Sequence, residues 1–286
     1  MTEKFNRRKF IKKTALVTAG AIVSPTIIPS CAKGANDKIT VAMIGTGEHG
    51  ILRNLNNFLK IPECRVVAVC DVDESRMLKA KHMVDEAYGD RGCKTFGDFR
   101  SILARKDIDA VQISTPDHWH VHQSIMALQS GKDVCCEKPT WTIDLGRKLV
   151  NVLDKTDRIY QTSLEDRSLP MYYRMAQLAR NGHIGKLTKM RTGLPGNHSI
   201  RVTKNTSVQP VPDGFDWEMW LGPAPYSPYS PGRTHFNFRW CSDYSIGSIA
   251  DWGAHLIDTA QWCNATEKWG PVEVQGEGSA PKEGYY

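Results

Sequence analysis

Short hydrophobic runs alternate with amphipathic stretches over the first half of the chain. Residues 38–44, 65–71, 110–115, 133–137 and 159–164 are rich in Val, Ile, Ala and Cys and predict strands. The intervening residues 50–60, 75–88, 118–130 and 143–154 predict helices. Near-continuous hydrophobic strands that alternate with helices are typical of a parallel sheet covered on both faces. The pattern therefore predicts a doubly wound α/β domain over residues 38–160.

The pattern changes beyond about residue 165. A helix is predicted over 171–182, followed by the polar-hydrophobic segment 186–194 and a run rich in Pro, Gly and aromatic residues up to residue 240. Such a segment suits loops on a second domain that shapes a pocket. We expect residues 161–286 to form an α+β domain with an open, mainly antiparallel sheet.

Composition fits an ordinary globular protein of about two domains, since 286 residues exceed the usual 100 to 200 per domain. The formal net charge is +6, but residues 1–30 supply +5 of it through Lys4, Arg7, Arg8, Lys9, Lys12 and Lys13 against Glu3. The rest of the chain is close to neutral and has no basic stripe with aromatic residues. Binding to nucleic acid is therefore not expected.

The basic N-terminus has the layout of an export signal. The segment NRRKFIKK at 6–13 precedes a hydrophobic stretch at 14–29 that is too short, and too interrupted by Pro, to span a bilayer. The paired arginines resemble a twin-arginine signal, which predicts export to the periplasm or the outer face of a bacterial membrane. Residues 28–31 resemble a lipoprotein box, so lipid attachment at Cys31 is an open alternative. Residues 1–37 are then signal and linker.

The eight cysteines and nine histidines predict neither a disulfide framework nor a metal site. The cysteines form no C-x-x-C pair, and several lie in strand-like runs where Cys packs as a small hydrophobe. His118 and His122 are one helical turn apart and could bind zinc, but no third ligand stands at a recognisable spacing. We expect no metal.

A glycine motif follows the first predicted strand. Residues 45–50, GTGEHG, fit G-x-G-x-x-G at the start of a helix, and Asp71 ends the second strand about 20 residues later. The glycines allow backbone amides to approach a pyrophosphate, and the Asp71 carboxylate can accept hydrogen bonds from a ribose. Because Asp71 would repel a 2′-phosphate, the sequence favours NAD over NADP.

Two further motifs carry charge. DVCCEKPTWT at 133–142 ends a hydrophobic run with Glu137 and Lys138, at the strand end where open α/β sheets bind ligands. DWGAH at 251–255 places Asp251 and His255 one helical turn apart. A carboxylate beside an imidazole makes a general base, but the spacing equally fits a helix cap and a buried core histidine.

Together, GTGEHG, Asp71, TPDHWH at 115–120, EKP at 137–139 and DWGAH resemble the glucose-fructose oxidoreductase, inositol dehydrogenase and MocA (Gfo/Idh/MocA) family. The resemblance covers most of residues 38–270. It implies a Rossmann domain over 38–160, a catalytic set of Lys138, Asp251 and His255, and a cofactor site formed by Gly45, Gly47, Glu48, His49, Gly50, Asp71, Thr115, Pro116, His120, Glu137 and Lys138. Segments that could line a substrate pocket contain Arg167, His235, Arg239 and Tyr244.

The resemblance implies hydride transfer between a hydroxyl of a sugar, glycoside or cyclitol and a nicotinamide cofactor. Export implies that this NAD is bound tightly and recycled in place. Two alternatives stay open: an NAD-dependent glycoside hydrolase or lyase that acts through transient oxidation at carbon 3, and a non-catalytic sugar- or nucleotide-binding protein. Lys138 favours the oxidoreductase, since the related glycosidases generally lack it. Comparable exported members have a longer second domain, so we expect residues 161–286 to lack closing strands; homo-oligomers are common in the family.

Overall fold

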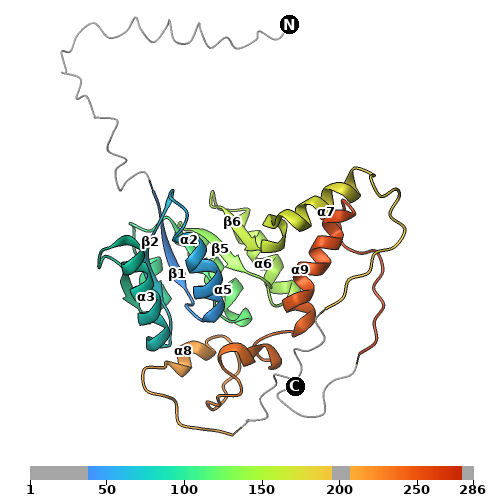
Figure 1. Ribbon diagram of the computed structural model, residues 1–286. Coiled ribbons are helices and arrows are strands. Elements are labelled where there is room, and N and C mark those ends of the chain that lie inside the picture. Colours follow the sequence, from blue (N-terminus) through green and yellow to red (C-terminus); the bar gives the residue numbers. More distant parts are fainter. Residues whose placement is uncertain (1–37, 195–206, 279–286) are drawn as a thin grey trace, which may run out of the picture. The chain divides into compact units, whose positions relative to one another are not determined.

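The computed structural model describes residues 38–194 and 207–278. A six-stranded parallel sheet forms its N-terminal part, with the strand order β3-β2-β1-β4-β5-β6 (Figure 1). The strands are β1 (Ile39–Ile44), β2 (Cys64–Cys70), β3 (Lys94–Phe96), β4 (Ala110–Ile113), β5 (Asp133–Glu137) and β6 (Tyr160–Ser163). This order is that of a doubly wound Rossmann sheet, in which the strand order reverses between β1 and β4. The predicted doubly wound α/β fold is confirmed.

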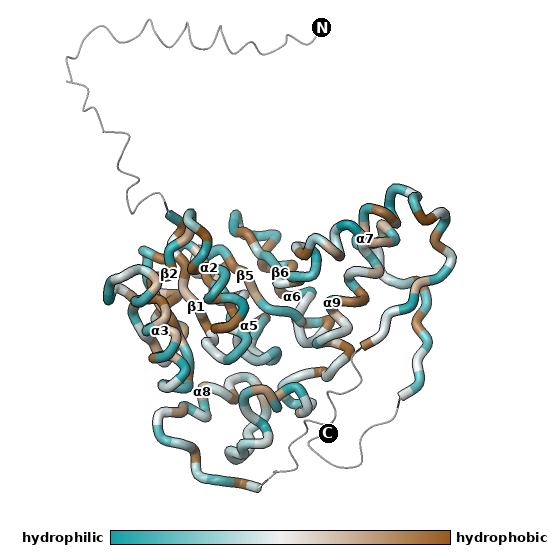
Figure 2. The backbone as a smooth tube through the Cα atoms, in the orientation of Figure 1, coloured by the Kyte–Doolittle hydropathy of each residue, from teal (hydrophilic) through white to brown (hydrophobic). Residues whose placement is uncertain are grey.

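Helices cover both faces of the sheet because the strands are hydrophobic on both sides. One face packs against α4 (Phe99–Leu103), α5 (Asp117–Gln129) and α6 (Ile143–Leu153). The other face packs against the helical run formed by η2 (Gly50–Leu55) and α2 (Asn56–Phe58), and against α3 (Glu74–Tyr88). Hydrophobic residues recur along the strands, whereas the helices mix hydrophobic and polar residues (Figure 2).

The predicted strands and helices of this part are all present, with ends that differ by one or two residues. The pattern missed β3 and α4, which have three and five residues and are too short to show a periodicity. It also did not predict that η2 is a π-helix. The Lys138–Pro139 peptide bond is cis.

The later part of the chain is helical where it is described. It contains η3 (Glu165–Ser168), α7 (Pro170–Arg180), α8 (Trp217–Leu221), η5 (His235–Trp240) and α9 (Ser248–Cys263). Helices α7 and α9 lie side by side and bury Ala176, Ala179 and Cys263 between them (Figure 1). Residues 164–194 and 207–278 form no strand, so the expected antiparallel sheet is not present in the described part. Residues 186–194 have no regular secondary structure there, since an extended segment is stabilised only by a partner strand.

Two sets of contacts join this part to the Rossmann sheet. The backbone amide of Glu74 donates to Gly214 and that of Asp216 donates to Val72, at 2.9 Å each. The indole of Trp119 donates to the carbonyl of Trp220 at 3.0 Å. In the ranges 38–194 and 207–278, no helix is long and hydrophobic enough to cross a membrane. The predicted export signal and Cys31 lie outside the described residues.

Candidate active site

A cleft of about 1340 Å³ lies along the carboxyl ends of the parallel strands and extends to α9. Its walls come from the glycine loop, the ends of β2, β4, β5 and β6, and the segments around residues 215–220, 235–239 and 251–255. Pockets for single small ligands have about 300–1,000 Å³. The cleft therefore has room for a dinucleotide together with a second, smaller molecule.

The glycine loop has no space for side chains at two positions. A Cβ on Gly45, whose φ is 88°, would lie 2.6 Å from the carbonyl carbon of Ser114. A Cβ on Gly50 would lie 2.5 Å from the carbonyl oxygen of Gly45. Gly47, Glu48 and His49 line the cleft where the helical run begins. Exposed backbone at the start of a helix is the arrangement that receives a pyrophosphate, so these residues fit a nicotinamide dinucleotide.

Asp71 holds the glycine loop in place. One carboxylate oxygen, Oδ2, accepts hydrogen bonds from the Thr46 amide at 2.6 Å and the Thr46 hydroxyl at 3.1 Å, and Oδ1 accepts from the Asp73 amide at 2.9 Å. Burial raises the pKa of Asp71, while these hydrogen bonds oppose that rise. Asp71 also lines the cleft, so one acceptor position is left for a ribose hydroxyl.

A cation near Asp71 was missed by the sequence reasoning. Arg76 of α3 lines the cleft, and its Nε lies 3.3 Å from Oδ2 of Asp73. His235 is at the same end of the cleft, 4.0 Å from Asp73. Burial, followed by the charge of Arg76, lowers the pKa of His235. The residue predicted for substrate binding at position 235 therefore lines the cleft beside Asp73.

The loop after β4 is joined to the EKP segment by His120. Its two ring nitrogens lie 2.8 Å from the carbonyl oxygen of Thr115 and 2.9 Å from that of Pro139. Thr115, Pro116 and His120 all line the cleft, as predicted for cofactor neighbours. His120 is buried, and both of its nitrogens are occupied by protein carbonyls.

Glu137 faces the glycine loop. Its Oε1 accepts a hydrogen bond from the Asn54 amide at 2.9 Å and lies 3.1 Å from Nε2 of His49. Burial raises the pKa of Glu137, but the contacts with His49 and Asn54 outweigh this effect and hold it below its usual value. The first charge of the EKP motif is therefore an anion that fixes the glycine loop against β5.

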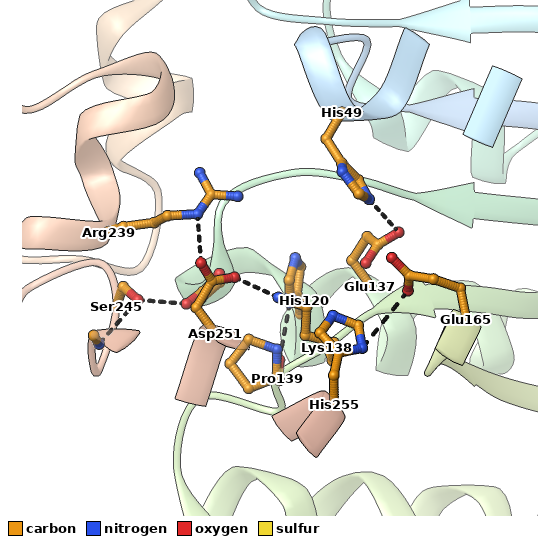
Figure 3. Close-up of polar contacts among 12 residues, drawn as sticks. His49, His120, Glu137, Lys138, Pro139, Glu165, Arg239, Ser245, Asp251 and His255 are labelled. Atoms are coloured by element: carbon orange, nitrogen blue, oxygen red, sulfur yellow. Dashed lines mark hydrogen bonds and ion pairs between the residues drawn. The ribbon is translucent and has the colours of Figure 1, made fainter. Parts of the chain in front are cut away.

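The second charge of that motif enters a cluster with two residues from the later part of the chain (Figure 3). The Lys138 ammonium pairs with Oδ1 of Asp251, and Nε of Arg239 donates to Oδ2 of Asp251 at 3.1 Å. Burial raises the pKa of Asp251, but the charges of Lys138 and Arg239 outweigh it and lower that pKa. The side chains of these residues are only 11–20% exposed, so the charges interact in a poorly solvated environment.

Asp251 and His255 both line the cleft, but they form no hydrogen bond or ion pair with each other. Of the two readings that the DWGAH spacing left open, the pair is not formed in the structure, where the two oxygens of Asp251 bind Lys138 and Arg239. His255 instead faces Glu165 of η3, with its Nδ1 4.0 Å from Oε2 (Figure 3). That Nδ1 is buried and has no hydrogen-bond partner.

A buried hydrogen bond between Ser245 and Asp117 was also missed by the sequence reasoning. The Ser245 hydroxyl donates to Oδ2 of Asp117 at 2.6 Å, which ties the start of α5 to the segment before α9. Burial raises the pKa of Asp117, while nearby cationic groups and the Ser245 hydroxyl oppose the rise. No motif indicated this contact, because it joins positions 128 residues apart.

Two residues predicted to bind substrate do not line the cleft. Arg167 forms two hydrogen bonds with Asp258, at 2.6 and 2.7 Å, and its guanidinium lies over Trp262. Tyr244 is fully buried among aromatic residues of the later part of the chain. Each of the two side chains has a structural partner in these positions. Arg239 does line the cleft.

Histidine and cysteine positions show no metal-binding cluster within residues 38–194 and 207–278. Nε2 of His118 lies 3.1 Å from the carbonyl oxygen of Trp220, and burial lowers the pKa of His118 to about 4. Cys64, Cys70, Cys93, Cys135, Cys136, Cys241 and Cys263 are free thiols. His118 is thus a neutral core residue at pH 7 rather than a ligand facing the cleft.

Comparisons with known proteins match both parts of the chain. Residues 39–164 match the family model "Oxidoreductase family, NAD-binding Rossmann fold", and residues 182–283 match "Oxidoreductase family, C-terminal alpha/beta domain", both of Gfo/Idh/MocA type. These matches confirm the resemblance drawn from the motifs.

Individual relatives are more distant. An uncharacterised oxidoreductase of Rhizobium meliloti is 29% identical over 154 residues, which are 53% of this chain and 44% of the relative. A glycosyl hydrolase family 109 protein of Solibacter usitatus is 28% identical over 211 residues, 70% of this chain and 47% of the relative. The chain thus spans less than half the length of these curated relatives. A solved 3-ketoreductase of Actinomadura kijaniata, in complex with NADP and TDP-benzene, superposes with a TM-score of 0.55 at 21% identity, over 78% of this chain and 57% of that protein, which shows a shared fold.

Proposed function

Because the chain belongs to the Gfo/Idh/MocA oxidoreductase family and carries its NAD-binding Rossmann domain, we propose that it transfers a hydride between a hydroxyl-bearing carbon of a sugar, glycoside or cyclitol and bound NAD. One observation carries the proposal: Lys138, Asp251 and His255 line the same cleft as the glycine loop. Residues 113 positions apart in sequence, Lys138 and Asp251, are brought into contact there.

Each residue has a chemical role that follows from its surroundings. His255 accepts the proton of the substrate hydroxyl, because its imidazole lines the cleft on the same helix as Asp251. Lys138 stabilises the negative charge that develops on the substrate oxygen, since an ammonium has three donors and Asp251 occupies one. Asp251 orients Lys138 and Arg239. A nicotinamide cofactor, when bound, supplies the hydride acceptor.

NAD is the proposed cofactor, with NADP as the less favoured choice. The buried Asp71 carboxylate at the end of β2 favours a ribose with a free 2′-hydroxyl. Arg76, whose Nε lies 3.3 Å from Oδ2 of Asp73, offers a cation to a 2′-phosphate. Asp71 therefore favours NAD, whereas Arg76 favours NADP. Export by the twin-arginine route would carry the cofactor out with the folded protein, and we therefore propose that the cofactor is retained through many turnovers, in the periplasm or at a membrane through a lipid on Cys31.

Denaturation of the purified protein followed by mass spectrometry tests the cofactor directly. Release of NAD in a near-equimolar amount is expected, and release of NADP would reassign the preference to Arg76. A panel of sugars, glycosides and cyclitols is then added to native protein, and the absorbance of the reduced nicotinamide is followed. Two results together would contradict the proposal: the denatured protein releases no nicotinamide dinucleotide, and no substrate of the panel produces the absorbance of reduced nicotinamide.

The role of Lys138 is tested by Lys138→Met, with Lys148→Met as the matched control. Lys148 lies on α6, is 60% exposed and pairs with Asp144 outside the cleft. Removal of one electrostatic stabiliser of an oxyanion is expected to lower kcat by about 100- to 1,000-fold. A Lys138→Met variant that keeps the kcat of the control would exclude an oxyanion role for Lys138.

A glycoside hydrolase is the second candidate, because a relative described as a glycosyl hydrolase family 109 protein aligns over 70% of this chain. In that reading the cofactor is oxidised and reduced within one turnover. Release of free sugar from an aryl glycoside without net formation of reduced cofactor would favour this candidate. Net reduction by a free sugar or cyclitol would favour the oxidoreductase.

A further inference from the structure

The ring of His255 is buried on α9, and its Nδ1 has no hydrogen-bond partner. Only 8% of the residue is exposed, on the cleft-facing side of α9. The indole of Trp252 approaches the ring edge-on, with the centroids 6.4 Å apart. Its Nδ1 is buried without a hydrogen-bond partner, although a buried polar atom normally has one.

The charged groups around this ring differ in their availability. Lys138, Arg239 and Asp251 are engaged with one another, and Asp258 on the same helix is engaged with Arg167. Glu165 is different: its side chain is 48% exposed, and its Oε2 is the carboxylate oxygen at 4.0 Å from Nδ1 of His255 (Figure 3). A hydrogen bond between the two groups requires this distance to shorten to about 3 Å.

We propose that Glu165 is the positioning residue of His255; this inference rests on the proposed function. Nδ1–H donates to Glu165, which leaves the lone pair of Nε2 for the substrate hydroxyl. During oxidation the O–H bond breaks and its proton passes to Nε2, while the C–H hydrogen would leave with its electron pair to a bound nicotinamide. The Glu165 carboxylate stabilises the imidazolium, and after the product leaves, Nε2 returns its proton to water in the cleft, which restores the Nδ1–H tautomer.

Asp251 does not take this place in the structure. Its oxygens bind Lys138 and Arg239, and it forms no hydrogen bond with His255. Glu165, in η3 directly after β6, is the carboxylate that faces Nδ1 instead.

The first arm of the test is independent of turnover. Nitrogen-15 NMR of histidine-labelled protein, as purified, reports which ring nitrogen carries the proton, and a His255→Gln variant identifies the signals. The wild type is expected to hold the neutral Nδ1–H tautomer, and Glu165→Ala to shift toward the Nε2–H tautomer. Glu165→Gln should keep the wild-type tautomer, because its amide oxygen still accepts a hydrogen bond.

The second arm separates kcat from KM. Glu165→Ala is expected to lower kcat by about 10- to 100-fold, the range for carboxylate partners of metal-bound histidines, with KM changed by less than about 3-fold. Asp166→Asn is the matched control, since it removes the same charge from the same turn. An unchanged tautomer in Glu165→Ala, or an equal loss of kcat in Asp166→Asn, would overturn the inference. If none of the sugars, glycosides and cyclitols reduces the cofactor of the wild type, the proposed function fails, while the tautomer arm still decides the role of Glu165.

Discussion

The backbone of Gly222 packs directly against the ring of Trp119. The substitution Gly222→Ala therefore tests how tightly the later part of the chain is packed onto the Rossmann sheet. A Cβ at this position would lie 1.9 Å from Cζ2 of Trp119, and the backbone has a φ of 48° and a ψ of −114°. The indole of Trp119 donates to the carbonyl of Trp220 at 3.0 Å and packs edge-on against Phe99. Gly222→Ala must displace this ring.

The cost has three parts. A left-handed backbone with a Cβ costs about 1–2 kcal/mol, the lost hydrogen bond about 1 kcal/mol, and the disturbed aromatic contact about 0.5–1.5 kcal/mol. The free energy of unfolding should therefore fall by about 3 kcal/mol, as measured by urea denaturation. Because Trp119 also lines the cleft, cofactor retention should weaken in the same variant.

Gly89→Ala is the matched control, because Gly89 also has a positive φ, 67°, but a Cβ there would meet nothing within 4 Å. Only the backbone cost remains, so this variant should lose about 1 kcal/mol and keep its cofactor. Equal losses in Gly222→Ala and Gly89→Ala would refute the close packing between Gly222 and Trp119.

Three further predictions concern the charged and buried groups of the later part of the chain. Asp251→Asn leaves two poorly solvated cations without a counter-charge and should lower the free energy of unfolding by about 3 kcal/mol in urea at pH 7. Since the folded-state pKa of Asp251 is lowered, its contribution is complete above the unfolded pKa of about 4 and is lost as pH falls through the folded value, so the stabilities of wild type and Asp251→Asn should converge below about pH 4. Arg167→Ala removes a partly exposed pair with Asp258 and should cost about 1 kcal/mol with the substrate KM unchanged; a raised KM would restore a substrate role for Arg167. Tyr244→Ala should cost about 3–5 kcal/mol in the same urea assay, as expected for a fully buried aromatic residue, and a loss below about 1 kcal/mol would contradict its place in the core.

The sequence predicted the Rossmann part well because two periodicities act there at once. Hydrophobic strands that alternate with helices determine a parallel sheet, and a glycine motif after the first strand locates its ligand edge. Lys138 could be placed beside the cleft for the same reason, since it follows β5 directly. The short elements β3 and α4 were not predicted, because three to five residues are too few to show a hydrophobic periodicity.

The contacts of individual side chains were harder to predict, because spacing within one helix says nothing about competitors from elsewhere. The spacing of Asp251 and His255 made a pair plausible, but Lys138 and Arg239, which lie 113 and 12 positions away from Asp251 in the sequence, bind its carboxylate instead. Arg167 was assigned to the pocket without knowledge of Asp258, 91 positions further along the chain. Polar side chains on loops are assigned reliably only once their nearest opposite charge is known.

The reassignment of Asp251 changes how the motif D-x-x-x-H works in this chain. Asp251 binds a cation at each oxygen and forms no hydrogen bond with the histidine one turn away. Asp251 acts on the site through Lys138 instead, whose ammonium keeps two N–H donors for a substrate oxygen after one is given to the carboxylate. The base and the oxyanion stabiliser then have separate carboxylates, Glu165 for His255 and Asp251 for Lys138. In such a division Glu165 sets the tautomer of His255, while the charge of Lys138 stays fixed in the poorly solvated part of the cleft.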